Sequence, residues 1–326
     1  MSRSLHVRAN GLLHHVLEWT PDTPKHASRD RGLTGHADHA SPAPGANVPT
    51  VLLVHGFMDV GGSWDLVAPH LARAGFRVLA PDLRGFGDTE RAPEGSYYHF
   101  ADYVADVAAL VDALCGEAPF DLVGHSMGGT VTTLYAGAHP ERLAHLALLE
   151  GFGPPDNSAT VAPARMRRWL DDLRKHRAAS SSPGYERARS FATLDEALVR
   201  LQWNHPAVPD AVLRSRLVHM VKPVEGGRFA WRFDELHRTT SPTPFRADTH
   251  RAFIARVACP VLAVSGGADG FHVEDEEKRI ETFADVARAE LPGAGHMMHW
   301  TQPDRLAELL LAFFTRQRAR HSDLAR

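Results

Sequence analysis

Short apolar runs alternate with amphipathic segments through most of this 326-residue chain. Strand-like runs cover residues 51–54, 77–80, 120–123 and 143–149, and segments with helical spacing cover 64–74, 98–114 and 130–138. A chain that alternates strand and helix in this way needs crossover connections, which place its strands in a parallel sheet. The pattern therefore predicts an α/β fold with helices on both faces of a mostly parallel sheet.

The alternation stops at residues 151–155 and resumes near Arg246, with strands at 259–264 and 286–291 and helices at 274–283 and 303–318. We therefore expect a core formed by residues 1–151 and 246–326, with residues 152–245 inserted as a helical cap or lid. Residues 4–20 predict two strands joined at Asn10-Gly11, a hairpin turn sequence. Residues 21–49 contain almost no large apolar side chain, which predicts a flexible surface insertion.

Charge and composition limit the classes of function. The chain has 36 basic and 39 acidic residues, and this balance gives no reason to expect a nucleic-acid partner. Its longest apolar stretches, such as 143–149, are far shorter than the ~18 residues of a transmembrane segment. Two cysteines and an N-terminus without the apolar run of a signal peptide favour a cytoplasmic protein.

The segment GHSMGG at residues 124–129 follows one predicted strand directly and opens the next helix. This is the setting of a nucleophile elbow, a tight strained turn that projects a serine hydroxyl from the sheet. Side chains at positions 124 and 128 would clash in such a turn, which explains the two glycines. Ser126 is therefore the predicted nucleophile.

A serine hydroxyl needs a base within hydrogen-bond reach. His296 follows the last predicted strand, in a loop at its C-terminal end, where catalytic groups gather in open α/β sheets. His299 is the competing candidate, nearer the final helix. We expect His55, His70 and His125 to pack or hydrogen-bond locally.

The base in turn needs a carboxylate that fixes its tautomer. Two candidates stand after predicted strands, Asp269 and Glu150, and either gives the chain order nucleophile, acid, base. Asp269 is favoured, with Glu150 as the alternative acid. Asp82 also follows a strand, but its segment predicts a structural turn.

The developing oxyanion needs preorganised N–H donors. One is expected from the backbone of Met127, the residue after the nucleophile. The other is expected from the backbone of Phe57, beside Gly56, in the loop after the first core strand.

Several motifs occur in the order typical of the α/β-hydrolase superfamily. They are HGF at 55–57, PDLRGFG at 81–87, GHSMGG at 124–129, GGAD at 266–269 and GH at 295–296. The chain resembles the cap-bearing, esterase-like branch of that superfamily. The resemblance implies a sheet of about eight strands with a helical cap inserted after the sixth. The segment GGRFAWRFD at 226–234 resembles serine hydrolase-like proteins, and some related hydrolases place the acid after the sixth strand, where Glu150 stands.

The resulting hypothesis is a serine hydrolase that cleaves a carboxylic ester or related small-molecule acyl substrate through an acyl-enzyme, without cofactor or metal. Epoxide hydrolases and haloalkane dehalogenases of the same superfamily use an aspartate nucleophile, and Ser126 argues against both. The alternatives are a perhydrolase, a C–C bond hydrolase, and a ligand-binding or receptor-like protein with little turnover. A basic segment in the insertion, residues 165–177, either attracts an anionic substrate or lipid surface, or forms a solvated rim.

Overall fold

The fold is known from a computed structural model that describes residues 2–21 and 48–324. Its main sheet has eight strands in the order β1-β2-β4-β3-β5-β6-β9-β10. The strands are β1 Arg3–Ala9, β2 Leu12–Trp19, β3 Thr50–Val54, β4 Arg77–Pro81, β5 Phe120–His125, β6 Leu143–Leu149, β9 Val261–Ser265 and β10 Val286–Glu290. From β4 to β10 every neighbouring pair is parallel, whereas β1 and β2 join antiparallel at one edge. The predicted mostly parallel eight-stranded sheet is confirmed.

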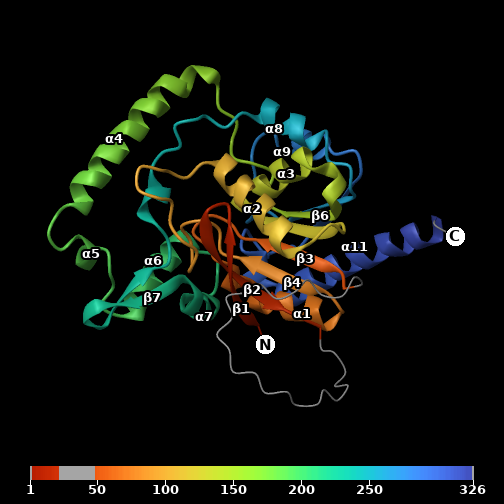
Figure 1. Cartoon of the computed structure of the whole chain (residues 1–326), viewed down its shortest axis with the longest axis horizontal. Coiled ribbons are helices and arrows are strands. Elements are labelled where there is room, and N and C mark those ends of the chain that lie inside the picture. The colour runs from red at the N-terminus through yellow and green to blue at the C-terminus, as the bar shows by residue number, and fades with distance from the viewer. Residues whose placement is uncertain (1, 22–47, 325–326) are drawn as a thin grey trace, which may run out of the picture.

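Helices cover both faces of this sheet (Figure 1). One face packs against α2 Phe100–Leu114, α3 Met127–Ala138 and α8 Ala247–Ile254, and the other against α1 Ala68–Arg73 and α11 Pro303–Leu324. Strand β3 shows why two cores form, because Leu52 and Val54 join the first cluster while Val51 and Leu53 join the second. Successive side chains of a strand point to opposite faces, so a strand buried on both faces is apolar throughout.

The predicted hairpin is present as β1 and β2, and it turns at two residues with positive φ. Asn10 has φ 47° and Gly11 has φ 77°, as a two-residue turn between twisted strands requires. The predicted flexible segment 21–49 lies, apart from its ends, outside the described residues.

The segment between β6 and β9 is built differently from the sheet. It contains α4 Ala162–Ser180, α5 Tyr185–Ala188, α6 Leu194–Asn204 and α7 Asp210–Met220. It also contains a two-stranded sheet, β7 Val221–Val224 and β8 Arg228–Trp231, which the expectation of an all-helical insertion did not include. Its buried apolar residues form a third small cluster together with Met297 and Trp300, apart from the two clusters of the main sheet. Figure 1 shows α4 at the outer edge of the molecule, and only Leu173 of that helix is buried.

The remaining helical segments are short. They are α9 Glu276–Ile280, α10 Met298–Thr301 and the 3-10 turns η1 Gly61–Leu66, η2 Pro140–Arg142, η3 Ala159–Val161, η4 Glu225–Gly227 and η5 Glu235–Arg238. Within the described residues, no helix combines the length and the apolar character that a membrane span requires.

Candidate active site

Ser126 lies at the sharp turn between β5 and α3. Its backbone has φ 52° and ψ −119°, a strained conformation for a residue with a side chain. Two flanking glycines make room for the turn. A Cβ on Gly128 would lie 2.4 Å from the carbonyl oxygen of Val54, and one on Gly124 would lie 2.3 Å from Oγ1 of Thr132. The sequence pattern is therefore explained by close packing around the backbone of a half-buried serine.

His296 lies in the loop after β10 and bridges two groups from other elements. Its Nε2 is 2.9 Å from Oγ of Ser126, and its Nδ1 is 2.8 Å from Oε2 of Glu150. A carboxylate only accepts hydrogen bonds, so the ring proton lies on Nδ1. Nε2 then carries the lone pair and accepts the hydrogen bond of the serine hydroxyl. This is the tautomer that removes a proton from the hydroxyl.

Glu150 follows β6 directly, and its carboxylate is held by three donors. Oε1 accepts from the amide of Gly266 at 2.6 Å, and Oε2 accepts from the amide of Phe271 at 2.7 Å and from His296. The side chain is 2% exposed. Burial raises the pKa of Glu150, but the hydrogen bonds from His296, Phe271 and Gly266 outweigh burial and hold the pKa below its usual value. Glu150 is thus a buried, ionised partner for an imidazolium.

The expectation that favoured Asp269 as the partner of the histidine is wrong in this structure. Asp269 is exposed, in the loop that wraps the carboxylate of Glu150. Two glycines of that loop, Gly266 and Gly270, lie against the carboxylate of Glu150, and Gly266 also lies against the backbone of Gly295. A Cβ on Gly266 would lie 2.9 Å from Oε1 of Glu150, and one on Gly270 would lie 1.9 Å from it. The motif around Asp269 therefore positions Glu150.

The loop after β3 lies against the serine, as predicted. A Cβ added to Gly56 would lie 3.0 Å from Cβ of Ser126, so this glycine permits the approach. Among the described residues, neither the amide of Phe57 nor that of Met127 has a backbone or side-chain acceptor. Both residues line the same cavity as Ser126. Both amides are therefore available to a ligand.

Histidines outside this triplet make local contacts. His299 does not contact Ser126; its Nε2 lies 3.1 Å from Oδ2 of Asp59. Nε2 of His125 donates to the carbonyl oxygen of His296 at 2.8 Å. His55 accepts from the amide of Leu83 at 2.9 Å through Nε2. Local hydrogen bonding is confirmed for His55 and His125.

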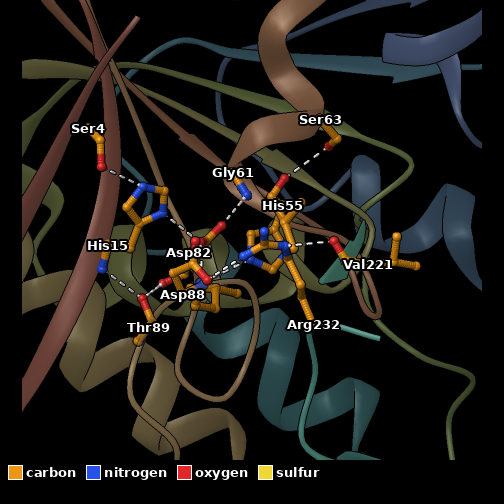
Figure 2. Close-up of polar contacts among 12 residues, drawn as sticks. Ser4, His15, His55, Gly61, Ser63, Asp82, Asp88, Thr89, Val221 and Arg232 are labelled. Atoms are coloured by element: carbon orange, nitrogen blue, oxygen red, sulfur yellow. Dashed lines mark hydrogen bonds and ion pairs between the residues drawn. The ribbon is translucent and has the colours of Figure 1, made fainter. Parts of the chain in front are cut away.

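The turn after β4 is structural, as predicted, and its centre is Asp82 (Figure 2). Oδ1 of Asp82 accepts from the amide of Gly61 at 2.7 Å, and Oδ2 accepts from the amide of Asp88 at 2.9 Å and from Nδ1 of His15 at 2.7 Å. Asp88 also pairs with Arg232 of the segment between β6 and β9. Asp82 therefore ties the edge hairpin to the turn, and Asp88 ties the turn to the inserted segment.

A cavity of about 290 Å³ opens in front of Ser126. Among the described residues that line its wall, seven are aromatic and none is a lysine or arginine. The aromatic lining residues are Phe57, Tyr97, Tyr98, Phe100, Tyr103, Trp169 and Phe271. Trp169 of α4 packs edge-on against Tyr97, with ring centroids 5.0 Å apart. The inserted segment completes the wall with Leu236, His237, Thr239, Thr240, Ser241 and Pro242. Sheet loops and insertion together enclose the space.

Comparison with known proteins assigns the family. Residues 49–303 match the family described as alpha/beta hydrolase fold. A hypothetical protein from Pseudomonas aeruginosa PAO1 has a solved structure that superposes with a TM-score of 0.76 at 26% identity, covering 96% of this chain and 99% of that one. The chain therefore belongs to the alpha/beta hydrolase fold family.

Curated relatives carry two kinds of name. A serine hydrolase-like protein of Danio rerio is 31% identical over 177 residues, which cover 54% of this chain and 52% of that protein. Epoxide hydrolase A of Mycobacterium tuberculosis is 28% identical over 313 residues, which cover 83% of this chain and 91% of that protein. Epoxide hydrolase B of the same organism is 39% identical over 114 residues, 32% of its length. The match thus spans about half the length of the serine hydrolase-like protein and about a third of the length of epoxide hydrolase B.

Proposed function

We propose that this protein is a serine hydrolase that cleaves a carboxylic ester or related acyl compound. Ser126 is the nucleophile, His296 the base and Glu150 the acid. The observation that carries the proposal is the bridging position of His296, 2.9 Å from the hydroxyl of Ser126 and 2.8 Å from the carboxylate of Glu150. A chain of nucleophile, base and orienting carboxylate at these distances is the arrangement that activates a serine.

The reaction follows from these contacts. Nε2 of His296 takes the proton of the Ser126 hydroxyl as Oγ attacks the acyl carbon, and the imidazolium forms against Glu150. The amides of Phe57 and Met127 donate to the oxyanion. The tetrahedral intermediate collapses, the bond to the leaving alkoxide breaks, and the imidazolium returns its proton to that oxygen. Water, deprotonated by His296, then attacks the acyl-serine, releases the acid and restores the hydroxyl of Ser126.

We infer that the substrate is uncharged and apolar in the part that the cavity encloses. Seven of the lining side chains are aromatic, and among the described lining residues there is no lysine or arginine to pair with a carboxylate or phosphate. The segment 152–245 acts in this proposal as the cap, because Trp169 and Leu236 close the cavity opposite Ser126. Selection among acyl groups therefore depends on residues of both the sheet loops and the cap.

A cytoplasmic, reducing location is also proposed. Cys115 and Cys259 are the two cysteines of the chain, and they are not paired with each other. Burial raises the pKa of each thiol to about 12, so neither is a reactive thiolate near neutral pH.

Turnover of p-nitrophenyl acetate and butyrate by the purified protein tests the function. We expect saturable hydrolysis that Ser126→Ala reduces to background, while Ser180→Ala, an exposed serine at the end of α4, keeps the wild-type rate. Retained turnover in Ser126→Ala would contradict the proposed nucleophile. Tight binding of such esters without any turnover would favour the ligand-binding alternative.

A further inference from the structure

Three polar side chains converge behind His296, on the side away from the substrate cavity. They are Asp59, from the loop after β3, His125, at the end of β5, and His299, in α10. One nitrogen or oxygen atom from each side chain lies within 4.8 Å of the other two. The three residues are 1%, 1% and 0% exposed, respectively. The proposed hydrolysis uses none of these side chains.

The first of the three, His125, has a fixed tautomer. Its Nε2 lies 2.8 Å from the carbonyl oxygen of His296, and a carbonyl only accepts, so the ring proton is on Nε2. Nδ1 is then a bare lone pair, buried and without a partner among the described residues. Gly56 faces this nitrogen, and a Cβ there would lie 3.0 Å from it. Leaving a buried acceptor unsatisfied costs about 1–3 kcal/mol, so this lone pair calls for a ligand.

Asp59 and His299 supply the other two atoms. Oδ2 of Asp59 lies 3.1 Å from Nε2 of His299, while Oδ1 accepts from the amide of Val60 at 2.8 Å. In the described part of the chain, no lysine or arginine forms an ion pair with Asp59. Nδ1 of His299 is also buried without a partner there. The site therefore combines a buried carboxylate, which lacks a permanent cationic partner, with two imidazole rings.

We propose that Asp59, His125 and His299 form a binding site for a divalent transition-metal ion of the zinc class. Two imidazole nitrogens and one carboxylate oxygen are a common ligand set for such ions. Metal–ligand bonds of ~2.1 Å separate neighbouring ligand atoms in a tetrahedron by about 3.4 Å, and the 3.1 Å between Asp59 and His299 is close to this. In this proposal the third ligand atom is Nδ1 of His125, the ring nitrogen that has no partner among the described residues.

The surroundings resemble those of metal ligands. A ligating histidine usually donates its other N–H to a carbonyl or carboxylate, as Nε2 of His125 does to His296. Oγ of Ser63 lies 3.5 Å from Nε2 of His299 and donates to the carbonyl oxygen of Val60 at 3.0 Å. On binding, the ion replaces the proton on Nε2 of His299, and that proton moves to Nδ1 of the same ring. The two positive charges of the metal ion then face the carboxylate of Asp59 and the two neutral imidazole rings.

Metal content and metal position test this site directly. Because the ligands are buried, the protein is produced in medium supplemented with Zn²⁺ or Co²⁺ and then washed with chelator. We expect the wild type to retain one ion more per chain than His299→Gln, since glutamine keeps a hydrogen bond to Asp59 but lacks the imidazole. The matched control is His205→Gln. The ring of His205 lies near the cluster, with its centroid 5.2 Å from that of the Trp300 ring, and it is not one of the three proposed ligands.

An anomalous difference map of wild-type crystals grown with Co²⁺ tests the proposed metal site even if His299→Gln fails to fold. A peak between Asp59, His125 and His299 supports the proposal. A saturated crystal with no peak at that position would overturn it. Equal metal retention in the wild type and a folded His299→Gln would overturn it as well.

Discussion

The carboxylates of Glu150 and Asp269 differ in every property that matters for orienting a histidine. Glu150 is buried and accepts from His296 and from two amides, whereas Asp269 is exposed. We expect Glu150→Gln to reduce kcat/KM by ~10²- to 10⁴-fold, because an amide stabilises neither the required tautomer nor the imidazolium. Asp269→Asn should stay within a few-fold of the wild type.

Steady-state kinetics on p-nitrophenyl butyrate measure this difference, with circular dichroism to check that both variants are folded. The opposite ranking, with Asp269→Asn inactive and Glu150→Gln active, would exclude Glu150 as the acid. The two variants form a matched pair, since each replaces one carboxylate by its amide.

At the scale of elements, the elbow between β5 and α3 is the most sharply constrained feature. A Cβ at position 128 would lie 2.4 Å from the carbonyl oxygen of Val54, which belongs to a central strand that cannot move aside. We therefore expect Gly128→Ala to lower the free energy of unfolding by more than about 2 kcal/mol and to abolish hydrolysis. Urea denaturation and ester turnover measure the two effects.

Gly226→Ala is the control for backbone conformation alone. Gly226 has φ 73° and open space around it, so alanine there costs only the left-handed penalty of about 1 kcal/mol. A Gly128→Ala protein as stable and active as Gly226→Ala would show that the close packing of the elbow is not required.

The helices and strands of the main sheet and their order were predictable from local sequence patterns. The carboxylate that orients His296 was not. The central strands β3 and β6 are apolar because both of their faces are covered. The elbow is marked by Gly124 and Gly128, so both features leave clear traces in the sequence. Glu150 and Asp269 each follow a strand, and their distances from His296 depend on how the loop after β9 wraps. The glycines at 266 and 270 were the available evidence, since they make room for Glu150. The cluster of Asp59, His125 and His299 joins three distant segments and leaves no local pattern.

At the scale of the whole molecule, buried histidines make stability depend on pH. Burial lowers the pKa of His250 to about 4, and both its ring nitrogens lack partners among the described residues. Between the unfolded value of 6.5 and about 4, the unfolded chain binds a proton that the folded chain does not. The free energy of unfolding is therefore not reduced by His250 above pH 6.5, and it falls as the pH drops from 6.5 toward 4. His237 acts in the same direction, since burial lowers its pKa to about 3.

Urea midpoints between pH 7.5 and 5 test this effect in the wild type and in His250→Leu. We expect the free energy of unfolding to fall less steeply on acidification in the variant than in the wild type. The two slopes should differ by up to about 1.4 kcal/mol per pH unit. Replacing the ring by leucine removes no hydrogen bond, so stability at pH 7.5 should be similar or higher. Parallel curves for the two proteins would contradict the assignment of His250 as a neutral buried group.

Substrate selection is also a property of the whole molecule, because sheet and insertion share the cavity. Trp169 of α4 lines it, whereas Trp203 of the same inserted segment is 71% exposed and does not. We expect Trp169→Ala to lower the preference for hexanoate over acetate esters by ~3- to 10-fold through lost apolar contact. Trp203→Ala should leave that preference unchanged. An equal effect of both substitutions on the kcat/KM ratios would exclude α4 as part of the acyl site.

The proposed hydrolysis depends on a covalent acyl intermediate at Ser126. A fluorophosphonate probe mimics the acyl group and traps such a serine, so we propose peptide mass spectrometry of the labelled wild type as the test. We predict a single adduct on the peptide that contains Ser126, no adduct in Ser126→Ala, and much slower labelling in Glu150→Gln. An adduct on another residue, or ester turnover that survives complete labelling, would contradict the account.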